Sequence, residues 1–170
     1  KNSAEQGSQA CANLIESLPK ERHSELDLVI IGAGPAGVAA ALKATEAGLN
    51  FQVLEQEALG GTVYTFPRDK VVMTQPMDLP LHGKLKLYHT SKEELVGLWQ
   101  DLFERYKIPI REHCKVEGIK PLGDYHFALS LAEGEELHCS SVWIAIGRRG
   151  TPRKLGVPVE KSNKEAYRQL

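Results

Sequence analysis

The chain has 170 residues, of which 42% are hydrophobic and 25% are charged, enough for one globular domain with a sizeable core and too few for two. Its formal charge of −1 gives no electrostatic reason to expect nucleic acid or an anionic membrane as a partner, so small-molecule chemistry is the better expectation. No apolar run approaches the roughly 20 residues of a membrane helix, and the first 25 residues lack the apolar core of a secretory signal, so we expect a cytoplasmic protein.

The three cysteines, Cys11, Cys114 and Cys139, are odd in number and form no C-x-x-C pair, so we expect reduced thiols and no disulfide framework. Two of them directly follow a histidine, His113 and His138, which raises the alternative of a metal site. Both pairs lie in stretches predicted to be extended, where adjacent side chains point to opposite faces. We therefore predict no metal site.

The first elements in chain order form a βαβ unit. Residues 1–25 are mostly polar and begin without methionine, so we expect a linker or a cut end there. Residues 26–31 are a β-branched apolar run, typical of a strand covered on both faces. A glycine-rich turn follows, then a predicted helix over residues 38–47 and a second strand over residues 51–54, which ends at Glu55.

The chain then departs from a repeating βαβ pattern. The sequence Gly-Gly-Thr at residues 60–62 opens some thirty residues without a sustained helical period, in which only residues 70–74 appear extended. A long irregular segment of this kind indicates a ligand-binding or interface role. Thr90 and Glu93 have capping-box spacing, and apolar residues then recur on one helical face as far as Tyr106.

The last predicted elements are strands. Residues 108–110 are extended, and three short strands follow over residues 116–120, 125–131 and 136–139. The tight turns between these three strands permit only an antiparallel meander. Residues 142–146 are another buried-strand run, and beyond Pro152 the chain becomes polar.

Gly32, Gly34 and Gly37 have the spacing G-x-G-x-x-G between a predicted buried strand and a helix. In that context the backbone can approach a pyrophosphate at Gly34, while the unpaired N–H groups of the helix start face the phosphates. Gly37 would let the helix and the strand pack closely. The alternative is a turn that needs glycine only for its backbone angles.

Glu55 follows Gly37 by 18 residues, close to the spacing at which a carboxylate accepts hydrogen bonds from an adenosine ribose. A 2′-phosphate beside Glu55 would be repelled by about 1 to 4 kcal/mol per unit charge at about 4 Å. Glu57 adds to this repulsion, and no arginine lies within residues 51–65 to offset it. We expect this site to take FAD or NAD and to reject NADP. The alternative is an acid solvated at a strand end.

Three motifs together resemble the FAD domain of the thioredoxin-reductase-like family of flavoproteins, the pyridine nucleotide-disulfide oxidoreductases. They are residues 27–37, residues 60–62 and the sequence Ala-Ile-Gly-Arg-Arg at residues 145–149. The resemblance implies an α/β fold, a Rossmann-like FAD-binding domain with a parallel sheet and a small antiparallel β-meander. It covers residues 26–158 and implies that residues 159–170 are a linker toward an NAD(P)-binding domain outside the sequence.

The resemblance also implies the residues that bind the cofactor, and it implies no catalytic residue. The pyrophosphate would lie against the glycine turn, the adenosine ribose against the acid after the second strand, the ribityl chain or flavin near the Gly-Gly-Thr loop, and the adenine edge against a backbone group of the meander. A glycine after the last strand would pass close to the cofactor. These positions are Gly32, Gly34, Pro35, Ala36, Gly37, Glu55, Gly61, Thr62, Val116 and Gly147. Ile146 stands where the family usually has threonine.

Full enzymes of the family also need a second glycine-rich unit for NAD(P)H, a late Gly-Asp segment and, in disulfide reductases, a C-x-x-C pair; the sequence contains none of these. Since hydride transfer requires a nicotinamide stacked on the flavin, we expect no turnover by the chain alone. Our first hypothesis is the FAD-binding part of an oxidoreductase that passes electrons from NAD(P)H to a disulfide or an iron–sulfur partner. The alternatives are a non-catalytic module that binds NAD or ADP and half of a flavin monooxygenase-like protein.

Overall fold

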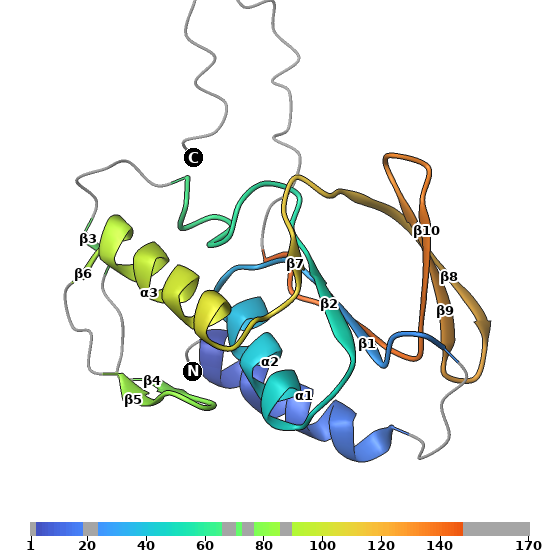
Figure 1. Ribbon diagram of the computed structural model, residues 1–170, viewed down its shortest axis with the longest axis horizontal. Coiled ribbons are helices and arrows are strands. Elements are labelled where there is room, and N and C mark those ends of the chain that lie inside the picture. Colours follow the sequence, from blue (N-terminus) through green and yellow to red (C-terminus); the bar gives the residue numbers. More distant parts are fainter. Residues whose placement is uncertain (1–2, 19–23, 66–70, 73–76, 86–89, 148–170) are drawn as a thin grey trace, which may run out of the picture.

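The computed structural model describes residues 3–18, 24–65, 71–72, 77–85 and 90–147 (Figure 1). At its centre is a parallel sheet with the strand order β11-β1-β2-β7. Its strands are β1 (Leu28–Ile31), β2 (Phe51–Leu54), β7 (Ile110–Arg111) and β11 (Val142–Ile144). The other strands of the described ranges form smaller antiparallel sheets.

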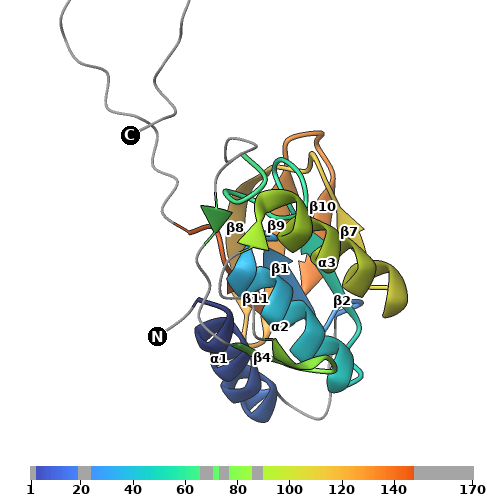
Figure 2. The same cartoon turned by 90° about the vertical axis from the view of Figure 1, so that its left-hand side faces the viewer.

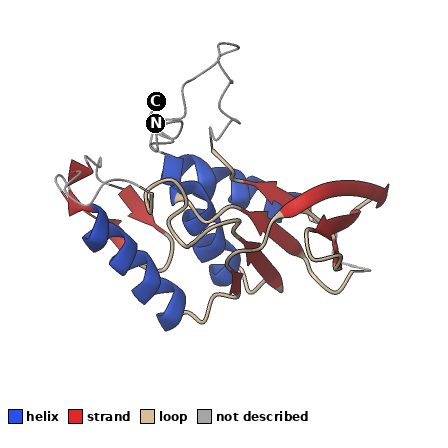
Figure 3. Ribbon diagram, turned by 90° about the horizontal axis from the view of Figure 1, so that it is seen from above, coloured by secondary structure: helices blue, strands red, loops and turns tan. Residues whose placement is uncertain are grey.

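Successive side chains of β1 point to opposite faces of the sheet, and both faces are covered. Leu28 and Ile30 pack into a core with the helices, whereas Val29, between them, packs into a second core with the antiparallel sheet. The helices and that sheet therefore lie on opposite sides of the parallel sheet, giving three layers (Figure 3).

The antiparallel sheet has the strand order β10-β9-β8 and was predicted as a meander. Its strands are β8 (Val116–Gly123), β9 (His126–Leu131) and β10 (Glu136–Cys139), close to the predicted bounds. The predicted fold class, a Rossmann-like α/β domain with a parallel sheet and a small antiparallel meander, is confirmed. None of the helices in the described ranges is both long and apolar enough to span a bilayer.

Helix α2 (Pro35–Glu46) follows the glycine turn and is buried along most of its length. Beside it lies α1 (Ser3–Ser17), within the segment for which we expected a linker (Figure 2). Ala4, Gly7 and Cys11 form the buried face of α1, and the thiol of Cys11 lies 3.5 Å from the carbonyl oxygen of Ala40 in α2. The residues that pack onto the parallel-sheet domain therefore begin before residue 26.

Helix α3 (Lys92–Arg105) has the predicted amphipathic pattern, but its capping box is shifted by one residue. The side chain of Ser91 accepts a hydrogen bond from the N–H of Glu94, and the Glu94 carboxylate accepts one from the N–H of Ser91. Thr90 and Glu93 are not the pair because Thr90 is buried in strand β6 (Thr90–Ser91), from which its hydroxyl also donates to Glu94.

The segment expected to be irregular contains three short strands among its described residues. These are β3 (Val71–Val72), which pairs with β6, and the hairpin of β4 (Met77–Leu79) and β5 (Gly83–Leu85). The predicted extended stretch over residues 70–74 is thus found at β3, and its other residues lie outside the described ranges.

Candidate nucleotide-binding site

The sheet order creates a crevice at the carboxyl end of β1. From β1 the chain passes to β2 and β7 on one side, and β11 is added on the other side. In open α/β sheets, ligands bind outside the carboxyl ends of the strands at such a reversal of strand order. A cavity of about 600 Å³ lies here, within the usual size range of small-molecule sites.

Nine of the ten predicted site residues line this cavity. They come from the glycine turn and the start of α2, from the end of β2, from the Gly-Gly-Thr loop, from the start of β8 and from the turn after β11. The nine are Gly32, Gly34, Pro35, Ala36, Glu55, Gly61, Thr62, Val116 and Gly147. The fold therefore brings together residues that are as far as 115 positions apart in the sequence.

Gly37 is the predicted residue that does not line the cavity. It is buried, and a Cβ atom built on it would overlap the carbonyl oxygen of Gly32. Gly32 is constrained as well, since its φ is +102° and a Cβ atom there would lie 2.6 Å from the carbonyl oxygen of Ala145. These two glycines allow β1, α2 and β11 to approach one another, which is the packing role predicted for Gly37.

Gly34 differs from both, because a Cβ atom built on it meets no atom within 4 Å. It is the N-cap of α2, has ordinary backbone angles, and makes no side-chain capping bond. Pro35 follows at the first helical position and has no N–H to donate. The N–H groups of Ala36 and Gly37 belong to the first turn and have no acceptor within the helix, so the start of α2 offers donors and a positive dipole end to a ligand in the cavity.

Glu55 is 6% exposed and faces the same cavity from the end of β2. Its Oε2 atom accepts a hydrogen bond of 2.7 Å from the N–H of Ala33 in the glycine turn, and its Oε1 atom accepts one of 2.9 Å from the N–H of Glu57. A carboxylate oxygen can accept more than one hydrogen bond, so both atoms retain capacity for a ligand hydroxyl. The alternative of an acid solvated at a strand end does not agree with this burial.

The Gly-Gly-Thr loop lies directly against the glycine turn. The N–H of Gly60 donates to the carbonyl oxygen of Ala33 at 2.9 Å. Gly61 has a φ of +53°, and a Cβ atom on it would lie 3.4 Å from the backbone of Gly34. Thr62 follows and is exposed at the cavity. The loop thus forms a wall next to the first turn of α2.

The remaining walls come from the segment before β8 and from the end of β11. Cys114 lies next to Glu55. The N–H of Cys114 donates a hydrogen bond of 2.9 Å to the carbonyl oxygen of Glu55. Partial burial raises the pKa of the Cys114 thiol above its ordinary value. On the other side, Ile144 and Ile146 are more than half exposed and also line the cavity.

Sequence reasoning missed part of this lining. The missed residues are Ser3, Gln6, Gly7 and Ala10 of α1, together with Ile31, Leu54, Gln56, Cys114, Trp143, Ile144, Ala145 and Ile146. Cys114 and Ile144 could have been found from the sequence. Cys114 lies two positions before Val116, which was predicted to bind the adenine edge, and Ile144 lies two positions before Ile146, where the family usually has threonine. The α1 residues carry only a weak signal, a spacing of small residues at positions 4, 7 and 11.

A sequence model of the family described as "Pyridine nucleotide-disulphide oxidoreductase" matches residues 29–170. The chain belongs to this family. The resemblance to the FAD domain of thioredoxin-reductase-like members of the pyridine nucleotide-disulphide oxidoreductases is thereby confirmed, and the match includes every predicted site residue.

Individual relatives agree with this assignment. The chain is 28% identical to a ferredoxin–NADP reductase of Ignicoccus hospitalis over 141 residues, which are 83% of the chain and 43% of that protein. It is 28% identical to a thioredoxin reductase of Helicobacter pylori over 79% of the chain and 39% of that protein. The crystal structure of Lactococcus lactis thioredoxin reductase matches with a TM-score of 0.63 and 25% identity, over 79% of the chain and 39% of that structure. The chain spans less than half the length of each.

Proposed function

We propose that this chain binds FAD and is the FAD-binding part of a flavin-dependent NAD(P)H oxidoreductase. In the intact protein, electrons would pass from NAD(P)H through the flavin to a disulfide or an iron–sulfur partner. The observation that carries the proposal is the start of α2, which has no side-chain cap and faces a cavity of about 600 Å³ together with the buried carboxylate of Glu55.

The residues of the cavity fit a dinucleotide. The phosphates would lie beside Gly34, where a side chain is missing and the amides of the first turn are available. Glu55 would accept hydrogen bonds from the adenosine ribose, and Val116 would place a backbone group at the adenine edge. Thr62 and Gly147 lie at the cavity from two other loops, where the ribityl chain and the flavin would pass.

The bound flavin would supply the hydride and electron transfer, and the residues of this chain would bind and orient it. In this proposal the glycine turn holds the pyrophosphate and Glu55 holds the adenosine ribose, so the rest of the cofactor is directed along the cavity. The nicotinamide site would be supplied from outside these 170 residues. The relatives named above are called reductases of ferredoxin and of thioredoxin, in keeping with the two acceptor classes proposed.

Titration of the purified 170-residue chain with FAD, NAD and ADP tests the proposal. We expect FAD to bind more tightly than ADP, because the cavity extends past Thr62 to Gly147, beyond the part that ADP would fill. Calorimetry gives the affinities, and flavin absorbance identifies the bound cofactor. Tighter binding of NAD, or binding of none of the three ligands, would contradict the proposal and favour a non-catalytic module.

A substitution in the glycine turn tests the proposed phosphate contact. Gly34→Val should lower the FAD affinity at least about tenfold, because its side chain would occupy the approach to the phosphates, and one decade of affinity corresponds to about 1.4 kcal/mol. The backbone angles of Gly34 suit any residue, so the fold should persist in far-ultraviolet circular dichroism. Gly97→Val in α3 is the matched control, because that glycine also has open space around a Cβ atom and does not line the cavity.

A further inference from the structure

Helix α1 forms a wall of the cavity, although the family match begins only at residue 29. Ser3, Gln6, Gly7 and Ala10 of α1 line the same space as Gly34, Pro35 and Ala36 of the glycine turn and α2. These lining residues all belong to the N-terminal parts of the two helices. The N-terminal ends of α1 and α2 lie side by side in two perpendicular views (Figures 1 and 2).

Gly7 fixes the position of α1 against the first turn of α2. It is buried, and a Cβ atom built on it would overlap the carbonyl oxygen of Ala36. The two helix backbones therefore touch at this point without an intervening side chain. One turn further along, the thiol of Cys11 reaches the carbonyl oxygen of Ala40. These contacts hold the first turns of α1 beside the proposed phosphate position.

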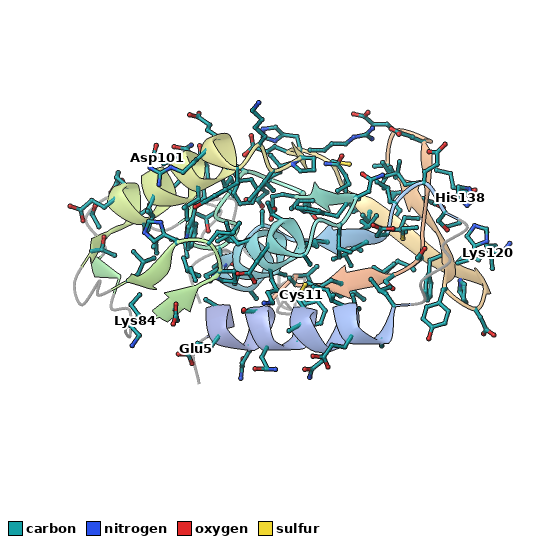
Figure 4. All side chains as sticks on the ribbon, turned by 60° about the horizontal axis from the view of Figure 1, so that its bottom comes forward. Glu5, Cys11, Lys84, Asp101, Lys120 and His138 are labelled. Atoms are coloured by element: carbon teal, nitrogen blue, oxygen red, sulfur yellow. The ribbon has the colours of Figure 1, made fainter. Side chains whose placement is uncertain are left out.

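The residues that α1 contributes to the cavity lining carry no charge, although the helix contains Glu5 and Glu16. The carboxylate of Glu5 is not part of the cavity lining, and Glu5 projects away from the body of the molecule (Figure 4). Its neighbour Gln6, which is neutral and carries two N–H donors, does line the cavity. The lining thus includes a neutral residue that can donate hydrogen bonds and leaves out the neighbouring acid.

We propose that α1 completes the cofactor cavity and that the side-chain amide of Gln6 donates a hydrogen bond to the phosphates of the bound dinucleotide. This inference rests on the proposed binding of FAD and adds to it a helix outside the matched family segment. Gly7 is then a positioning residue, because its missing side chain sets the distance between Gln6 and the start of α2.

The test uses two matched pairs of variants on α1. Gln6→Ala removes the donor and should weaken FAD binding about fivefold, in the range of the net contribution of a typical hydrogen bond. Gln6→Glu should weaken it about tenfold or more at low ionic strength, through repulsion between the carboxylate and the phosphates, and the loss should shrink as salt is added. Gln9→Ala and Gln9→Glu are the controls, because Gln9 is exposed on the same helix, bonds to Asn13 and does not line the cavity. Both control variants should stay within about twofold of the unsubstituted chain.

The outcomes separate this inference from the proposed function. If the unsubstituted chain binds FAD and the Gln6 variants bind it equally well, α1 only supports the fold and the inference is overturned, while the proposed function stands. If the unsubstituted chain does not bind FAD, both fail. Gly7→Ala adds an independent measurement, since moving α1 away from Ala36 should weaken FAD binding about as much as the loss of the Gln6 donor.

Discussion

Glu55 joins the proposed binding site to the fold itself. Its carboxylate is buried and accepts hydrogen bonds from the N–H groups of Ala33 and Glu57, so it ties the glycine turn after β1 to the end of β2. A buried carboxylate requires such donors, because desolvation strongly disfavours an unpaired charge. The residue expected to select the ligand therefore also shapes the turn that would hold the phosphates.

Glu55→Gln should consequently lower stability as well as affinity. The amide presents its NH2 group to one of the two backbone donors, which then loses its acceptor, at an expected cost of about 1 to 3 kcal/mol in the free energy of unfolding. Urea denaturation without any ligand measures this. Glu104→Gln, an exposed change on α3 away from the cavity, should alter stability by less than about 0.5 kcal/mol. Unchanged stability with reduced FAD affinity would mean that Glu55 acts on the ligand alone.

The glycine turn shows how far local spacing determines a site. Gly32, Gly34 and Glu55 could be placed from the sequence, because a strand, a tight turn, a helix and a second strand follow one another and fix their positions. The spacing could not show that a Cβ atom on Gly37 would meet Gly32 whereas one on Gly34 would meet open space. That distinction depends on how α2 lies across the sheet.

Among the elements, α1 could not be recognised as part of the domain from the sequence. Its buried face consists of Ala4, Gly7 and Cys11, which are small residues that give little hydrophobic signal among polar neighbours. Small side chains suit this position because α1 lies backbone to backbone against α2. The small side chains that let α1 approach α2 closely are thus also the reason why the segment resembles a linker in the sequence.

The N-terminus of α3 gives a prediction at the scale of one element. Ser91→Ala should lower the free energy of unfolding by about 1 kcal/mol, because the N–H of Glu94 loses its side-chain acceptor. The N–H of Ser91 and the hydroxyl of Thr90 donate to the Glu94 carboxylate and hold its pKa below the usual value. A carboxylate whose pKa is lowered by folding stabilises the fold at a pH above its pKa in the unfolded chain. The hydrogen bonds to the Glu94 carboxylate should therefore stabilise the fold less as the pH falls.

Thermal or urea unfolding of three variants distinguishes the observed box from the one predicted by spacing. Ser91→Ala and Glu94→Ala should both destabilise the protein, and Glu93→Ala should have the smallest effect of the three. Ser130→Ala, an exposed serine on β9, serves as the control for the loss of a hydroxyl. A larger effect of Glu93→Ala than of Glu94→Ala would instead support a capping box formed by Thr90 and Glu93.

At the scale of the whole molecule, two buried thiols occupy the two cores on either side of the parallel sheet. Cys11 lies in the core formed with the helices, and Cys139 lies in the core formed with the antiparallel sheet. Both are fully buried, and burial raises the pKa of each thiol to about 11 from the ordinary 9.0. Each thiol therefore reports on one of the interfaces between the three layers.

These pKa values predict alkaline destabilisation. A group whose pKa is raised by folding contributes its full stability below the unfolded pKa, and this contribution is lost as the pH rises from about 9 to about 11. The loss should reach roughly 1 kcal/mol per thiol by pH 10, because the unfolded thiol is then ionised and the folded one is not. Urea denaturation from pH 7.5 to 10.5 measures it. Cys11→Ala and Cys139→Ala should each flatten the dependence by about that amount, and the double variant by both. Slopes equal to that of the unsubstituted chain would mean that the thiols titrate alike in the folded and unfolded states, so that water reaches both interfaces between the layers.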